Sequence, residues 1–207
     1  MPDAPHVPTT TSGIAADASL TINPHRSRRD HTLTGGDGDD LFIVSASNSF
    51  VTTVTDFEVG TAVPNGDTLD LLDIVLTAVT REDILGGVVT RADGLTIESY
   101  EVDATGVVTL YDTNTALGLT TEVFAESTAE AVDVANALLL NILSTNGGAI
   151  ATAAITFGLD ADGNGTAEST IVASTDGTDT NIVQLVGVAF GNALATGGPA
   201  VDTIDII

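Results

Sequence analysis

GGDGDDLFI, residues 35–43, matches the nine-residue pattern G-G-x-G-x-D-x-U-x at every specified position, with a large apolar residue at U. Glycines at its first, second and fourth positions have no Cβ, so the backbone can turn tightly and direct carbonyl oxygens inward. Asp40 adds a charged oxygen, and Leu41–Ile43 leaves the turn as a short strand with Phe42 directed to the core. The pattern predicts a calcium-binding turn, because calcium is a hard cation that prefers oxygen ligands.

One turn of this kind supplies only part of a calcium site, since the ion takes about six to eight oxygen ligands. The remaining ligands must come from other segments of the chain. An ordinary turn between strands is the alternative interpretation, because glycine and aspartate are common in turns without any metal. The candidate ligands within the turn are Gly35, Gly36, Asp37, Gly38 and Asp40.

This turn resembles the repeats of the repeats-in-toxin family, which are secreted calcium-binding proteins of bacteria. The preceding residues 26–34, RSRRDHTLT, keep the strand half of a repeat but place Arg28 and His31 where glycine and aspartate are expected. Residues 54–74, VTDFEVGTAVPNGDTLDLLDI, resemble the segment that closes such rolls. The resemblance therefore implies that Asp56, Asp67 and Asp70 complete the site around the turn.

A second acidic segment, GLDADGNGTAES at residues 158–169, offers another candidate calcium loop. Asp160, Asp162 and Asn164 have the alternate spacing of the first ligands of a calcium loop, and Glu168 can complete a looser site. The twelfth position is Ile171 instead of a carboxylate, and the flanking residues are typical of strands rather than helices. Asn164-Gly165 is also a hairpin signal, so a β-turn without metal is the alternative.

The charge of the chain excludes several classes of partner. There are 29 acidic side chains against five arginines and no lysine, for a formal net charge of -24. Neutralising phosphates requires a basic surface, so nucleic acid and anionic membranes are excluded as partners. Calcium that binds only the folded state would offset the self-repulsion of the chain and stabilise it by about 2.7 kcal/mol at a hundredfold excess over Kd. General acidity of a salt-adapted protein is the alternative explanation.

The compartment follows from several sequence features together. The chain has no cysteine, so disulfides do not stabilise it. Residues 1–13 do not have the pattern of a Sec-type signal, which is a positive start followed by an apolar run. No apolar run is long enough to span a membrane. The family resemblance implies type I export with an uncleaved carboxyl-terminal signal, and the ending VDTIDII is similar to such a tail, although a terminal β-strand would have the same pattern. We therefore expect an extracellular or cell-surface bacterial protein.

Alternating Val, Ile and Thr residues between Gly, Asn and Asp turns predict a mainly β protein, a β-sandwich or β-roll-like fold with one amphipathic helix packed on a sheet. A helix is expected over about residues 128–143, opened by Ser127 or Thr128 with Glu130 behind it. A shorter helix is expected from Thr80 to the Gly86-Gly87 pair. Strands are predicted at residues 19–22, 41–44, 51–55, 68–72, 94–102, 107–112, 154–159, 170–173 and 181–188.

Three segments are expected along the chain: an extended N-terminal arm (1–31), a β domain with the calcium turn (32–128), and a helix with C-terminal β-hairpins and the export tail (129–207). The arm is rich in Pro, Thr and Ala, and residues 13–22 can add as a strand to the sheet edge of another copy. Arg26, Arg28 and Arg29 would then meet an acidic surface of that copy. Such a head-to-tail contact extends into a filament or lattice unless it closes into a ring.

Signatures of catalysis are absent from the sequence. All three histidines lie within the first 31 residues, there is no zinc-protease or serine-hydrolase motif, and tryptophan is missing. We therefore expect a non-enzymatic, secreted, calcium-binding structural protein that assembles into a filament, surface layer or matrix. The alternatives are a monomeric calcium-stabilised adhesin, ligand-binding module or secretion domain, and an enzyme with an unrecognised acidic active site.

Overall fold

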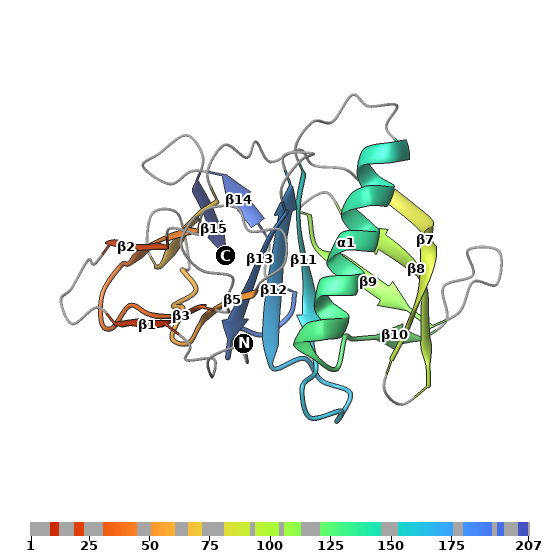
Figure 1. Ribbon diagram of the computed structural model, residues 1–207, viewed down its shortest axis with the longest axis horizontal. Helices are drawn as coiled ribbons and strands as arrows, with labels where there is room; N and C mark the ends of the chain where they lie inside the picture. The colour runs from red at the N-terminus through yellow and green to blue at the C-terminus, as the bar shows by residue number, and fades with distance from the viewer. Residues whose placement is uncertain are drawn as a thin grey trace, which may run out of the picture.

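The computed structural model describes residues 9–12, 19–22, 31–44, 51–60, 66–71, 81–91, 94–103, 106–112, 121–145, 153–175, 180–191, 194–196 and 203–206. These residues form a mainly β structure with one helix among them, which confirms the predicted fold class (Figure 1). The elements are β1 (Thr9–Ser12), β2 (Ser19–Ile22), β3 (His31–Thr34), β4 (Leu41–Val44), β5 (Val51–Val54), β6 (Thr68–Asp70), β7 (Arg81–Thr90), β8 (Thr96–Val102), β9 (Val108–Tyr111), β10 (Glu122–Val123), α1 (Thr128–Thr145), β11 (Ala153–Leu159), β12 (Ser169–Thr175), β13 (Thr180–Val186), β14 (Leu194–Thr196) and β15 (Thr203–Ile206).

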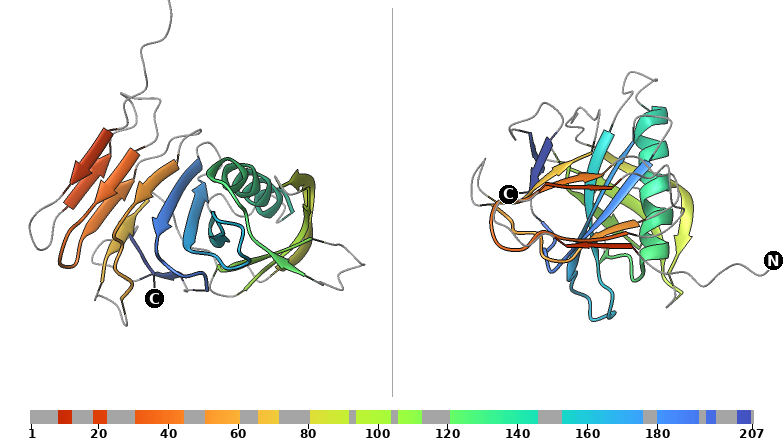
Figure 2. Two further views of the ribbon diagram at one scale, coloured as in Figure 1. Left: turned by 90° about the horizontal axis from the view of Figure 1, so that it is seen from below. Right: turned by 60° about the vertical axis from the view of Figure 1, so that its left-hand side comes forward.

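The first six strands form a parallel two-sheet roll. β1, β3 and β5 pair in parallel in one sheet, and β2, β4 and β6 pair in parallel in the other, so the chain alternates between the sheets. The strands lie side by side in successive coils at one end of the molecule (Figure 2). Paired residues such as Thr9 and His31, or Ser19 and Leu41, show that one coil is longer than two nine-residue repeats.

Strands from the rest of the chain extend both sheets of the roll. β5 pairs with β13, which continues through β12 to β11 and completes a six-stranded sheet. β6 pairs with β15, which pairs with β14 and completes a five-stranded sheet. β7 to β10 form a separate four-stranded antiparallel sheet. The terminal residues Thr203–Ile206 are therefore a paired strand.

The six-stranded sheet is covered on both faces around β12, which explains why every residue of that strand is buried. Ile171 and Ala173 face one core, which α1 and the four-stranded sheet complete, and Val172 faces the second core inside the roll. The second core also contains Leu33, Phe42 and other apolar residues of the coils. Figure 1 shows α1 on the side of the sheet that faces β7 to β10.

α1 begins where the capping signal predicts. The Ser127 hydroxyl accepts a hydrogen bond from the Glu130 N–H at 3.2 Å, and the Glu130 carboxylate accepts one from the Glu126 N–H at 2.8 Å. The first contact satisfies an amide that a helix N-terminus leaves without a partner, and the second joins the residue before the cap to the first turn. The buried face of the helix contains Ala131, Val134, Ala135, Leu138 and Leu139. No helix in the described part of the chain has the length and apolar character needed to cross a membrane.

The predicted helix from Thr80 to the Gly86-Gly87 pair is wrong, because Arg81–Thr90 is strand β7. β7 pairs antiparallel with β8, and its register shifts between Ile84 and Val89. The glycine pair lies within this irregular part of the strand instead of ending a helix. Pairing with β8 has overridden a local pattern that is compatible with a short helix.

The topology divides the chain differently from the three expected segments. The described parts of the expected arm, β1 and β2, pair with β3 and β4 of the same chain and are coils of the roll. Strands β11 to β15 of the expected third segment extend the same two sheets. Residues 13–18 of the proposed strand-addition segment, and the arginine cluster at 26–29, lie outside the described residues.

Candidate metal centre

The turn at residues 35–40 joins β3 to β4 and has the tight backbone that its glycines predict. Gly36 and Gly38 have φ angles of 107° and 116°, a region that favours glycine. Gly35 is required for a different reason, because a Cβ there would lie 2.8 Å from Cγ of Asp40 and 3.0 Å from Phe42. The Asp40 side chain thus folds back over Gly35 and is only 2% exposed.

Asp56, in the segment after β5, binds the backbone of this turn. Its two carboxylate oxygens accept hydrogen bonds from the Gly35 N–H at 3.0 Å and the Gly36 N–H at 2.9 Å. Successive backbone amides that converge in this way form an anion-binding concavity. The turn therefore binds the next coil through the Gly35 and Gly36 amides, which both donate to the Asp56 carboxylate.

Asp67 makes the second connection between the two coils. Its Oδ1 accepts a hydrogen bond from the Asp40 N–H and its Oδ2 accepts one from the Glu58 N–H, both at 2.8 Å. Burial, together with the nearby Asp40 and Asp56 charges, raises the pKa of Asp67 to about 6, although the two amide bonds oppose the shift. Asp67 is thus a buried structural carboxylate within a group of acids.

The structure brings Asp56 and Asp67 to the turn, as the family resemblance implies, whereas their role as calcium ligands stays a prediction. Asp37 is exposed, and Asp70 lies in β6 opposite Ile43 of β4. Within the described residues, the turn has no group of three ligand atoms from acidic or histidine side chains close enough to share an ion; such a group occurs only at residues 160–168.

The loop at residues 160–168 connects β11 to β12 and holds that acidic cluster. One carboxylate oxygen from each of Asp160, Asp162 and Glu168 lies within 4.8 Å of the others. Gly163 and Gly165 have φ angles of 69° and 88°, so the loop uses glycine where the backbone is left-handed. These three carboxylates could hold a metal ion together.

Asp160 and Asn164 organise the inside of this loop. The buried Asp160 carboxylate accepts hydrogen bonds from the Asn164 N–H at 3.1 Å and the Gly165 N–H at 2.7 Å. The Asn164 side chain donates to Glu168 at 3.0 Å and accepts from the Thr166 N–H at 2.8 Å. Asp160, Asp162 and Asn164 are therefore brought together, as predicted, in a loop with strands on both sides.

Sequence reasoning missed several acidic residues that take part in these arrangements. Asp39 accepts a hydrogen bond from the Gly66 N–H at 3.0 Å and adds a third link between the coils. Glu126 forms an ion pair with Arg91, and its Oε1 lies 3.8 Å from the position of a Cβ on Gly163. Both relationships join residues more than 25 positions apart, and no local motif indicates them.

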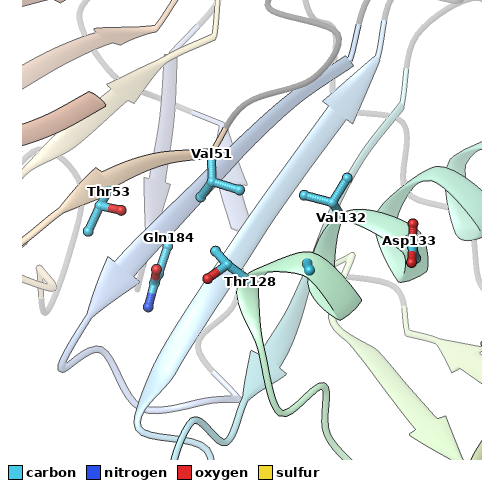
Figure 3. Close-up of a pocket in the computed structure, with 7 residues that line it drawn as sticks. Val51, Thr53, Thr128, Val132, Asp133 and Gln184 are labelled. Atoms are coloured by element: carbon cyan, nitrogen blue, oxygen red, sulfur yellow. The ribbon is translucent and has the colours of Figure 1, made fainter. Parts of the chain in front are cut away.

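A cavity of about 570 Å3 lies between α1 and strands β5 and β13 (Figure 3). Thr128 and Val132 extend from α1 toward Val51 and Gln184 of the sheet. The cavity offers hydroxyl and amide groups with one carboxylate, and therefore suits an uncharged or cationic small ligand better than an anion. Its lining residues are Val51, Thr53, Thr128, Ala129, Val132, Asp133 and Gln184.

Comparisons with known proteins provide no relative from which a role could be transferred. A scan against protein-family models and searches of curated proteins and of solved structures found no match. The function of the chain therefore has to be inferred from its residues and their geometry.

Proposed function

We propose that this chain is an extracellular, calcium-binding structural protein of bacteria that associates with copies of itself into a filament, surface layer or matrix. The observation that carries the calcium part is the convergence of Asp160, Asp162 and Glu168 in one short loop. Calcium fits this group better than zinc, because all the side chains offer oxygen ligands and no cysteine or histidine is present in the loop.

The ligand spacing in the loop supports calcium further. Asp160, Asp162 and Asn164 occupy the first, third and fifth positions of a calcium loop, and Gly165 occupies the sixth, where the sharp turn requires glycine. The Asp160 carboxylate accepts a hydrogen bond from the Gly165 N–H at 2.7 Å, which holds this sharp turn in place. Glu168 at the ninth position replaces the missing carboxylate at Ile171.

The net charge gives calcium a physical role in stability. A chain with a formal charge of -24 repels itself when folded, and a cation bound to the native state reduces that repulsion. Because calcium is abundant outside the cell, the fold would be strongest after export. The resemblance of the chain to type I secretion substrates supports this location, and the coil turn at 35–40 is our second candidate calcium site.

Calorimetric titration with calcium, together with thermal unfolding in calcium and in chelator, tests the binding proposal. The variants Asp162→Asn and Glu168→Gln change exposed side chains, so they should fold without metal. We expect both to weaken calcium binding at the loop and to reduce the calcium-dependent rise in Tm. Asp133→Asn on α1, which is also exposed, is the matched control for the loss of one charge.

Asp40→Ala examines the second candidate site separately. Loss of one class of calcium site in Asp40→Ala, with the loop site retained, would support a site at the coil turn. A wild-type chain that shows no heat of calcium binding and the same Tm in calcium and in chelator would contradict the calcium proposal. Electron microscopy in calcium and in chelator then tests whether assembly depends on the ion.

A second candidate function is a monomeric adhesin or ligand-binding module, and the cavity beside α1 favours it. Its volume lies within the range of about 300–1,000 Å3 that is usual for small-molecule sites. The Gln184 amide and the Thr53 and Thr128 hydroxyls would orient an uncharged, hydroxyl-rich ligand such as a sugar.

NMR titration with a set of simple sugars tests this second function. Chemical-shift changes that are confined to residues of the cavity, and that are lost in Gln184→Leu, would support the ligand-binding function. Gln184 is chosen because it is half-buried and directed to the cavity (Figure 3). A monomeric protein with these shifts would favour the ligand-binding module over the structural protein. Unchanged spectra with every sugar would count against it.

A further inference from the structure

The roll ends in two uncharged strand edges that lie together. β1 is the last strand of the six-stranded sheet and β2 is the last strand of the five-stranded sheet, so each has one outer edge that pairs with no other described strand. Figure 1 shows both strands at the same end of the molecule. That end therefore presents two rows of backbone donors and acceptors.

Apart from their short length of four residues each, these two edges lack the features that usually protect an edge strand. β1 has the sequence TTTS and β2 the sequence SLTI, without charge, proline or glycine. Their registers with β3 and β4 run without a shift. The edge strand β7 differs, because it begins Arg-Glu-Asp and contains a register shift. An unprotected edge is a template for another chain.

The opposite end of the six-stranded sheet cannot accept such an edge. In β11, the Thr156 N–H already donates to Gly106 O at 2.9 Å, and the Asp160 N–H just after the strand donates to Ala125 O at 2.9 Å. Isolated bridges join Val107 to Thr156 and Ala125 to Leu159. Among the described residues, the β11 edge is therefore already partly paired, which disfavours head-to-tail addition of a second copy to this sheet.

We propose that the β1–β2 end of the roll binds the same end of a second copy across a two-fold axis, giving a closed dimer. The contact is self-complementary because each copy supplies the same two edges. If the two-fold axis lies in the plane of this end, the edge strands of the two copies pair in antiparallel orientation. Antiparallel pairing is the more favourable arrangement. This dimer proposal rests on the proposed self-association. It adds which surface binds the second copy and the symmetry of the contact.

Charge makes this dimer sensitive to solution conditions. Each copy carries a formal charge of -24, so two copies repel one another, and the repulsion weakens as salt or bound calcium screens it. We therefore expect the dimer to form more tightly at high ionic strength than at low ionic strength. A dimer of this kind would be the building block of any larger assembly, which must then use a different surface.

Light scattering of the full chain, with and without calcium, tests the proposal with an edge variant. Register places Thr10 opposite Thr32 and Thr21 opposite Ile43, which are half-buried positions that alternate with buried ones along β3 and β4. These two positions of the edge strands are therefore chosen for lysine. Thr10→Lys/Thr21→Lys brings like charges together in a symmetric dimer, and should weaken dimerisation by about tenfold or more. Thr32→Lys on the neighbouring strand is the matched control and should remain dimeric.

Single cysteines report the symmetry, because the natural chain has none. We expect oxidation of Thr10→Cys, of Thr21→Cys or of an equal mixture of the two to give covalent dimers and nothing larger, whichever way the two edges match. A chain that is monomeric at every concentration and salt would overturn the proposal, as would a dimer that survives in Thr10→Lys/Thr21→Lys. So would crosslinked ladders longer than two copies.

The same samples separate this proposal from the proposed function. A dimer that forms equally in calcium and in chelator would leave the two-fold contact intact and would contradict calcium-dependent assembly. Filaments that form in calcium and persist unchanged in the edge variant would support the proposed function and overturn the closed dimer as its building block.

Discussion

The Asp67 carboxylate accepts a hydrogen bond from the Asp40 N–H at 2.8 Å and thereby joins two turns of the roll that are 27 residues apart in the chain. Asp67 is only 3% exposed, and its other oxygen accepts the Glu58 N–H. The turn with the calcium-binding pattern is therefore held on one side by a buried carboxylate. The stability of the roll must depend on the protonation of that group.

We predict that Asp67 makes the metal-free protein less stable as the pH rises from about 4 to about 6. Its pKa is raised from 3.8 to about 6 in the folded state, so within this window the folded chain binds more protons than the unfolded chain. Its contribution is present below pH 4 and is lost above pH 6, and amounts to roughly 3 kcal/mol. Urea unfolding between pH 3.5 and 7 measures it.

Asp67→Asn is the comparison for this pH dependence. Asparagine cannot titrate, so the difference between the unfolding free energies of the wild type and the variant should change across the window. Asparagine also replaces one accepting oxygen with an NH2 group, which lowers stability at every pH by a constant amount. A constant difference between the two proteins from pH 4 to pH 6 would contradict the assignment.

We predict that Gly35→Ala destabilises the roll through the Asp40 side chain. The added Cβ would lie 2.8 Å from Cγ of Asp40, which is too close, and overpacking of this kind costs about 1–3 kcal/mol. Gly35→Ala in an Asp40→Ala background should cost less, because the obstructing carboxylate is gone. A double-mutant cycle from thermal or urea unfolding measures this coupling. Equal costs in both backgrounds would refute the mechanism.

We predict that Asp56→Ala loosens the turn without unfolding the molecule. The variant leaves the Gly35 and Gly36 amides without the carboxylate that accepts them, and the loss of such charge-assisted bonds costs about 1–3 kcal/mol. Hydrogen exchange at these two amides should become faster, whereas amides of β12 in the buried sheet should keep their protection. Unchanged exchange at Gly35 and Gly36 would show that the Asp56 contacts contribute little.

The sequence predicted the structure correctly where a short stretch of residues carries the signal, such as apolar alternation or a turn motif. Phe42 with the turn before it and the capping residue Ser127 could be identified because each belongs to a short pattern, whereas Asp56 and Asp67 were indicated by the family resemblance. β1 could not be identified, since TTTS has no apolar alternation and its pairing depends on β3, 22 residues later. β7 was misassigned because its charged first turn and glycine pair are compatible with a helix until β8 pairs with it.

The final prediction concerns Glu126, which lies beside the candidate calcium loop. Its Oε1 lies 3.8 Å from the position of a Cβ on Gly163, and the same carboxylate neutralises Arg91 through an ion pair. Glu126→Gln removes the negative charge that neutralises Arg91, and this single change makes the local potential less favourable for a cation. We expect calcium to bind the loop about tenfold more weakly, which corresponds to about 1.4 kcal/mol.

Arg91→Gln should change calcium affinity in the opposite direction, because it removes a positive charge from the same neighbourhood. Calorimetry at low and at high ionic strength distinguishes this electrostatic effect from a structural one, since added salt screens charges and should reduce both changes. If Glu126→Gln and Arg91→Gln weaken calcium binding alike, the pair acts by holding the loop in place instead of by its charge. If neither variant alters the affinity, calcium does not bind beside Glu126.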